Sequence, residues 1–180
     1  PFAYGGGITT LNQIEKLFKL GIEKVVLNSC IDTNFNLITE ASTIFGSQSI
    51  VVSIDLKKNI FGKYQLMKKS GSKKIQYSLE DYVKKIEAHG AGEIFLNVID
   101  RDGTYLGYEC NLIETVSNLT TIPVVACGGA NSNESFKNAI NANASAAAAG
   151  SLFVYSAKGK GVLINYPSQE VLFDKVYTQI

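Results

Sequence analysis

Short apolar runs alternate with amphipathic stretches along most of the chain, and this alternation restricts the fold more than any other feature. The apolar runs are continuous rather than interrupted at every second residue, which is typical of parallel strands covered by helices on a sheet's faces. Strands are expected at 1–4, 24–27, 49–54, 93–98, 122–127 and 145–149, and helices at 10–20, 34–45, 78–89, 109–118 and 132–140. We therefore expect one α/β domain over residues 1–180, with a hairpin at about 60–77 turning around residues 70–72.

Composition excludes several classes of function. Lys plus Arg number 17 and Asp plus Glu 16, so the chain lacks the positive excess typical of nucleic-acid-binding proteins. Its apolar runs are far shorter than the about 18 residues that a membrane helix needs. Cys30, Cys110 and Cys127 show no metal-binding spacing and are expected to be small buried side chains, while His89 ends a helix and is expected to be structural. We expect a cytoplasmic protein with no metal, no other cofactor, and no nucleic-acid or membrane partner.

The chain contains an internal repeat with an offset of 122 residues. At this offset Gly6-Gly7 aligns with Gly128-Gly129, and Asn28-Ser29 aligns with Gly150-Ser151. Each pair follows an expected strand, so one strand–helix–strand–helix unit recurs with similar loop chemistry. In an eight-stranded barrel, two such units would lie on opposite sides of the mouth.

Glycine pairs after a strand let backbone N–H groups approach an anion, and the following helix adds a partial positive charge. The two repeated loop sets therefore predict two phosphate sites on a long substrate, although the same glycines could serve only to form tight turns. Asp102 can join the second site because Gly103 beside it can offer a backbone N–H group. The first predicted site comprises Gly7, Asn28 and Ser29, and the second comprises Asp102, Gly103, Gly128, Gly129, Gly150 and Ser151.

Three further positions carry candidate chemistry. Asp55 ends the apolar run 49–54, where an acid suits general acid–base catalysis, with a helix cap or a loop ion pair as the alternative. Asn97 could aim its amide at the same side of the sheet. Lys24 and Glu93 begin two different strands and could pair at the opposite end of the barrel, or could simply be surface charges.

Six segments resemble one known family in order: GGGI, FGSQSIVVSID, GAGEIFLNVIDRDGT, LGYE, TTIPVVACGGA and AAAAGSLF. Together they resemble the cyclase subunit of imidazole glycerol phosphate synthase, often called HisF, over about residues 1–155. The resemblance implies a (βα)8 barrel that binds a HisH-like glutaminase at its amino-terminal face. It also implies a lyase of histidine biosynthesis, which uses ammonia from the glutaminase to convert a bis-phosphorylated aminoimidazole-carboxamide ribulosyl nucleotide to imidazole glycerol phosphate.

Matched by motif, the resemblance implies that Asp55 is one of two catalytic aspartates. It assigns the two predicted phosphate sites to the two ends of the substrate. It further implies that Lys24 and Glu93 are two of four charges that gate an ammonia channel. Asn97 stands where the family usually has threonine, which weakens any specific role for it.

Departures from the family pattern leave a second function open. The first catalytic aspartate of the family, in a CLDV motif, has no counterpart, and Ile75-Gln76 replaces a threonine-glycine pair. The segment GVLINYPS at 161–168 resembles a paralogous branch that supplies ammonia to a sugar amidotransferase of surface polysaccharide (lipopolysaccharide) synthesis. The first expected strand of this chain matches the third strand of the family barrel. We therefore expect about six strand–helix units, which correspond to strands three to eight of the family, and no counterpart of the first two units. A barrel of this kind has about 250 residues; we expect an incomplete record or a truncated barrel, inactive alone as a cyclase.

Overall fold

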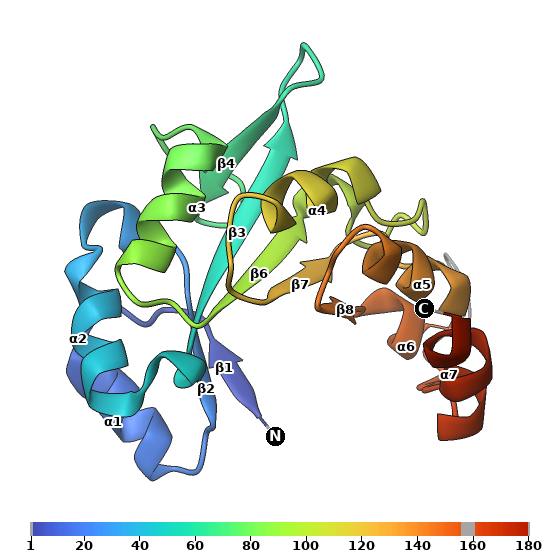
Figure 1. The fold of residues 1–180 in the computed structure, drawn as a ribbon, viewed down its shortest axis with the longest axis horizontal. Coiled ribbons are helices and arrows are strands. Elements are labelled where there is room, and N and C mark those ends of the chain that lie inside the picture. Colours follow the sequence, from blue (N-terminus) through green and yellow to red (C-terminus); the bar gives the residue numbers. More distant parts are fainter. Residues whose placement is uncertain (1, 156–160, 180) are drawn as a thin grey trace.

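The structure is a computed structural model that describes residues 2–155 and 161–179. Six parallel strands form a curved sheet in the order β1-β2-β3-β6-β7-β8, so each strand pairs with the next one along the chain. The strands are β1 (Ala3–Gly5), β2 (Lys24–Leu27), β3 (Ile50–Lys58), β6 (Glu93–Val98), β7 (Val124–Cys127) and β8 (Ala146–Ala148). The predicted six strand–helix units are confirmed as an arch, part of a barrel wall, with helices on its outer side (Figure 1). Pro1, the first residue of the first expected strand, lies outside the described residues.

The helices begin where the sequence supplies capping side chains. Thr10 accepts a hydrogen bond from the backbone N–H of Gln13, Ser78 from Asp81 and Ser132 from Ser135, each at a helix N-terminus. The main helices are α1 (Leu11–Lys19), α2 (Asn36–Phe45), α3 (Leu79–Ala88), α4 (Cys110–Ser117) and α5 (Asn133–Asn141), followed by the shorter α6 (Ser151–Val154) and α7 (Gln169–Lys175). Short 3₁₀ turns lie at Ile31–Thr33, Ser47–Ser49, Ile99–Arg101 and Tyr177–Gln179.

The two faces of the sheet differ sharply in burial. Side chains that face the helices are at most 2% exposed and form the core: Val25, Leu27, Ile50, Val52, Ile54, Leu56, Ile94, Leu96, Val98, Val124 and Ala126. Most side chains of the alternate positions are half-buried and many are polar: Lys24, Val26, Asn28, Ser53, Asp55, Glu93, Phe95, Asn97, Val125 and Cys127. Burying each large aliphatic side chain contributes about 1.5–3 kcal/mol, so the outer face holds the arch together. The polar side chains of the inner face are not part of this core and are available for a functional site.

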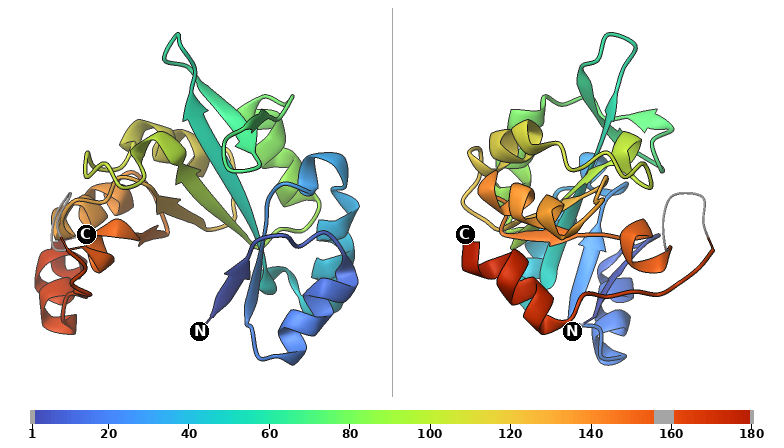
Figure 2. Two further views of the ribbon diagram at one scale, coloured as in Figure 1. Left: turned by 180° about the vertical axis from the view of Figure 1, so that it is seen from behind. Right: turned by 90° about the vertical axis from the view of Figure 1, so that its right-hand side faces the viewer.

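The hairpin differs in part from its predicted position. β3 continues to Lys58 and turns back at residues 59–63 into β4 (Tyr64–Lys68), which then pairs with β5 (Lys73–Lys74). The expected turn at 70–72 therefore exists, but between β4 and β5. The hairpin of β3 and β4 projects beyond the other strands (Figure 2). The sequence suggested that Asp55 ends a strand, and this is wrong. Three more residues of β3 follow Asp55 and pair with β4.

Some expectations about single residues need correction. Cys30, Cys110 and Cys127 are free thiols, but they are half-buried rather than fully buried. His89 is structural, as expected, since its Nδ1 lies 2.7 Å from the carbonyl oxygen of Lys85 and its ring packs on Phe35. Among the described helices, none combines the length and apolar character that crossing a membrane requires.

Candidate functional site

A polar row crosses the inner face of the sheet near the carboxyl ends of the strands. Asp55 of β3 lies opposite Asn97 of β6, and Asn97 lies opposite Cys127 of β7. The Asn97 Nδ2 donates to Asp55 Oδ1 at 3.0 Å, and the Ser53 hydroxyl donates to the same oxygen at 3.3 Å. The expectation that Asn97 points inward is therefore confirmed. The two bonds fix the carboxylate in one orientation on the open face.

The second predicted phosphate site forms one small hollow. All six of its residues line this hollow, together with four neighbouring residues from the same loops; the six are Asp102, Gly103, Gly128, Gly129, Gly150 and Ser151. They come from the loops after β6, β7 and β8, which lie side by side because the three strands are neighbours. Backbone N–H groups and a serine hydroxyl around a concave surface can bind a phosphate group.

Two glycines of this hollow have a conformation that other residues cannot adopt without strain. Gly128 and Gly129 have φ angles of +99° and +100°. A Cβ atom on Gly128 would lie 2.5 Å from the carbonyl oxygen of Val98, and one on Gly129 would lie 2.2 Å from that of Gly107. The glycines therefore let the loop after β7 approach the end of β6 and the loop that follows it.

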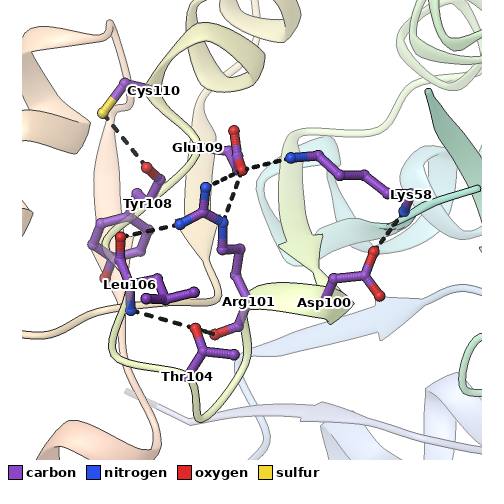
Figure 3. A network of polar contacts seen from close by, with 8 residues as sticks. All are labelled: Lys58, Asp100, Arg101, Thr104, Leu106, Tyr108, Glu109 and Cys110. Atoms are coloured by element: carbon purple, nitrogen blue, oxygen red, sulfur yellow. Dashed lines mark hydrogen bonds and ion pairs between the residues drawn. The ribbon is translucent and has the colours of Figure 1, made fainter. Parts of the chain in front are cut away.

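The loop between β6 and α4 is held by an ion-pair network that the sequence did not predict (Figure 3). The Arg101 guanidinium pairs with the Glu109 carboxylate through Nε at 2.8 Å and also through its second terminal nitrogen. Arg101 donates a further bond of 3.0 Å to the Leu106 carbonyl. Lys58 of β3 reaches the same Glu109 oxygen at 3.1 Å, and its backbone N–H donates to Asp100 at 2.5 Å. The loop carrying Asp102 and Gly103 is thereby tied to the hairpin.

Electrostatics favour the charged form of Glu109. Burial by itself would raise the pKa of this carboxyl, but hydrogen bonds from Arg101 and Lys58 outweigh it and bring the pKa below the ordinary value. The partner of Arg101 lies eight residues further along the chain. No local spacing rule signals this pair, because the loop doubles back to form it.

The first predicted phosphate site is not gathered into one hollow. Gly7 lines a groove against α1 with Tyr4, Gln13 and Lys16, and neither Asn28 nor Ser29 borders that groove. The hydroxyl of Ser29 instead accepts a hydrogen bond from the backbone N–H of Lys69 at 3.1 Å. Gly7 follows β1, whereas Asn28 and Ser29 follow β2. The two strands are neighbours, with Gly5 opposite Val26, so the three residues lie at the same edge of the sheet. The first phosphate site therefore stays a prediction, and in this structure its residues do not line one hollow as those of the second do.

Lys24 and Glu93 form the expected ion pair. Lys24 Nζ lies 2.6 Å from Glu93 Oε2, on the inner face at the amino-terminal ends of β2 and β6. These strands are not neighbours, because β3 lies between them. The two side chains therefore reach across the inner face, at the opposite end from Asp55.

A thiol also belongs to the polar row on the inner face. Burial, with further contributions from the charges of Asp102 and Asp55, raises the pKa of Cys127 to about 11. Cys127 is thus a neutral thiol at pH 7 and not an activated nucleophile. Within the described residues, no group of three or more His, Cys, Asp or Glu side chains could hold a metal ion.

Six parallel strands, outer helices and polar loops at the carboxyl ends of the strands define the class: the chain is part of a (βα)8, or TIM, barrel. Its sequence matches the family described as histidine biosynthesis protein over residues 1–159. A Leptospira borgpetersenii protein, provisionally named imidazole glycerol phosphate synthase subunit HisF, is 44% identical over 96% of this chain and 70% of its own length.

Two further relatives agree. Imidazole glycerol phosphate synthase subunit HisF of Natranaerobius thermophilus is 42% identical over 94% of this chain and 68% of its own. The HisF subunit of Thermotoga sp. strain RQ2 is 43% identical over 85% of this chain and 60% of its own. The chain thus spans roughly two thirds of the length of these relatives. It belongs to the HisF family, and the family resemblance read from its motifs is confirmed.

Proposed function

We propose that this chain provides most of the active site of an imidazole glycerol phosphate synthase cyclase, a lyase of histidine biosynthesis. Its substrate would be the bis-phosphorylated aminoimidazole-carboxamide ribulosyl nucleotide, cleaved and cyclised with ammonia. The observation that carries the proposal is the hollow that all six residues of the second predicted phosphate site line, beside the polar row that contains Asp55. Family membership supports the reaction class.

In this proposal Asp55 is the general acid or base. Its carboxylate lies on the open inner face, and Asn97 and Ser53 bond the same oxygen, Oδ1. The carboxylate is therefore held for proton transfer to or from a substrate that lies across the strand ends. One phosphate of the substrate would lie in the hollow of Gly103, Gly129 and Ser151. The other would lie near Asn28 and Ser29, on the far side of Asp55.

Ammonia would come from a HisH-like glutaminase subunit at the amino-terminal face. The relatives carry the word subunit in their names, which fits a protein that acts in a complex. The ion pair of Lys24 and Glu93 lies at that end of the inner face, where an ammonia molecule would enter. Opening the pair would let a small neutral molecule pass toward Asp55.

A paralogous role in surface polysaccharide synthesis is the second candidate. Its support is local: Ile75, where the family usually has threonine, is buried in the core at 3% exposure and cannot contact a substrate. In that role the barrel would supply ammonia to a sugar amidotransferase, and the ion pair of Lys24 and Glu93 would matter more than Asp55.

The test supplies the full-length protein with the bis-phosphate substrate and an ammonium salt, beside an active HisF cyclase as the positive control. Formation of imidazole glycerol phosphate that falls at least about 100-fold in Asp55→Asn supports the cyclase. No product from the wild-type protein, with product from the control, rejects the cyclase and leaves the amidation role.

A further inference from the structure

A buried ion pair lies outside the residues discussed so far. The ammonium of Lys68 pairs with Asp32 Oδ2, and the two side chains are only 9% and 11% exposed. Lys68 ends β4, and Asp32 lies in the 3₁₀ turn that follows β2. The pair therefore joins the hairpin to the segment that carries Asn28 and Ser29.

A second contact lies next to the ion pair and connects the same two segments. The backbone N–H of Lys69 donates to the Ser29 hydroxyl oxygen at 3.1 Å. Lys69 and Ser70 have φ angles of +53° and +55°, a left-handed conformation that costs energy for residues other than glycine. The chain holds this strained turn against Ser29, and the ion pair of Lys68 is the anchor nearest to it.

A buried ion pair of this kind adds little to the stability of a fold. Removing two charges from water is unfavourable, and their attraction offsets this only when the other polar atoms of the pair also have hydrogen-bond partners. They are not satisfied here: within the described part of the chain, Asp32 Oδ1 and the buried Tyr82 hydroxyl have no hydrogen-bond partner. Such a pair is better explained by the position that it imposes than by the stability that it adds.

The position matters because of what it does to the Ser29 hydroxyl. A hydroxyl oxygen that accepts a bond from Lys69 N–H must turn its own proton elsewhere. Its donor contact in the structure is the long one of 3.5 Å to Asn28 Oδ1, which a phosphate oxygen could replace. The turn thus presents Ser29 as a hydrogen-bond donor, as anion binding requires.

We propose that Asp32 and Lys68 are positioning residues for the first phosphate site, which clamp the turn 69–72 onto Ser29 and so orient its hydroxyl toward a phosphate group. The inference rests on the proposed function for the identity of the anion. The far side of the hairpin is tied to the other site, since Lys58 N–H donates to Asp100. One hairpin therefore contacts both loops that would hold the two ends of the substrate.

The experiment compares wild-type protein with Asp32→Leu/Lys68→Met, which removes both charges and leaves no unpaired ion in the core. Lys84→Met is the matched control, because Lys84 makes an exposed ion pair with Glu80 on α3. Amide NMR spectra establish that each variant is folded, hydrogen exchange reports on the Lys69 amide, and titration with inorganic phosphate reports on the amides of Ser29 and Ser151.

The clamp predicts at least tenfold faster exchange at Lys69 in the double variant, and at least fivefold weaker phosphate binding at Ser29. Ser151 should titrate as in wild type, which separates local positioning from general loosening. Unchanged Lys69 exchange, or faster exchange with unchanged binding at Ser29, overturns the inference. A wild-type protein whose Ser29 and Ser151 amides both fail to respond to phosphate overturns the proposed function instead, and the exchange rates then decide the clamp separately.

Discussion

The amide of Asn97 donates a hydrogen bond of 3.0 Å to Oδ1 of Asp55, across the paired strands β6 and β3. The two residues are 42 positions apart in the sequence and meet because their strands are neighbours in register. In the described part of the chain, the bonds from Asn97 and Ser53 both reach the same carboxylate oxygen. The two bonds therefore hold the carboxylate through one of its two oxygens.

The first prediction concerns Asp55 itself. Asp55→Asn should lower ammonium-dependent formation of imidazole glycerol phosphate by about 100-fold or more, because an amide cannot transfer the proton. The fold should survive, since the substituted side chain has nearly the same shape. Steady-state rates with an ammonium salt measure the effect, and circular dichroism checks the fold. A variant with wild-type turnover would remove Asp55 from the mechanism.

The second prediction concerns the ion pair at the opposite end of the inner face. Lys24→Met should alter glutamine-dependent turnover in the complex with a glutaminase and leave turnover on free ammonium unchanged, because the pair lies away from Asp55. Stability should change by only about 0–1 kcal/mol, as Lys24 is 39% exposed. Lys84→Met is the control variant. Equal effects on both nitrogen sources would contradict a role in ammonia passage.

The third prediction concerns pH. The folded-state pKa of Glu109 is below its ordinary value of 4.5, so its contribution to stability is complete above about pH 4.5 and is lost as the pH falls through the folded-state pKa. Glu109→Gln should therefore flatten the acid side of the stability curve, and it should cost stability at pH 7 because Arg101 loses its charged partner. Urea unfolding at pH 3, 4, 5 and 7 measures both. A parallel acid dependence in variant and wild type would contradict the role of Glu109.

The fourth prediction compares two glycines of the same hollow. Gly129→Ala should destabilise the fold by about 1–3 kcal/mol, because its φ is +100° and its new Cβ would meet the Gly107 carbonyl oxygen at 2.2 Å. Gly150→Ala should be nearly neutral, since no atom lies within 4 Å of the added Cβ. Thermal unfolding of the two variants side by side gives the answer. Similar losses in both would mean that the loops around Gly129 are not packed as described.

The fifth prediction concerns Cys127. With a pKa raised to about 11, its alkylation by iodoacetamide should reach half its maximal rate near pH 11 in the folded protein, against about 9 after unfolding. Peptide mass spectrometry at a series of pH values follows this thiol separately from Cys30 and Cys110. A half-maximal rate near pH 9 in the folded protein would show that burial does not raise the pKa of Cys127.

The sequence by itself determined the alternation of strands and helices, the glycine turns and the family. These properties are local: apolar periodicity, capping residues such as Ser78, and turn-forming glycines such as Gly128 act over a few neighbouring positions. The motifs also selected six of the ten residues that line the hollow. Their agreement with the structure follows from a simple rule, since parallel neighbouring strands bring their carboxyl-end loops together.

Only the tertiary structure decided which distant side chains meet. Arg101 pairs with Glu109 rather than with the adjacent aspartates, Lys68 pairs with Asp32, and Gly7 lines a different groove from Ser29. Each outcome depends on how far a strand continues and where a hairpin folds back, and β3 runs three residues past Asp55. Local preferences do not fix such lengths and directions, because long-range pairing and burial outweigh the small energies of single turns.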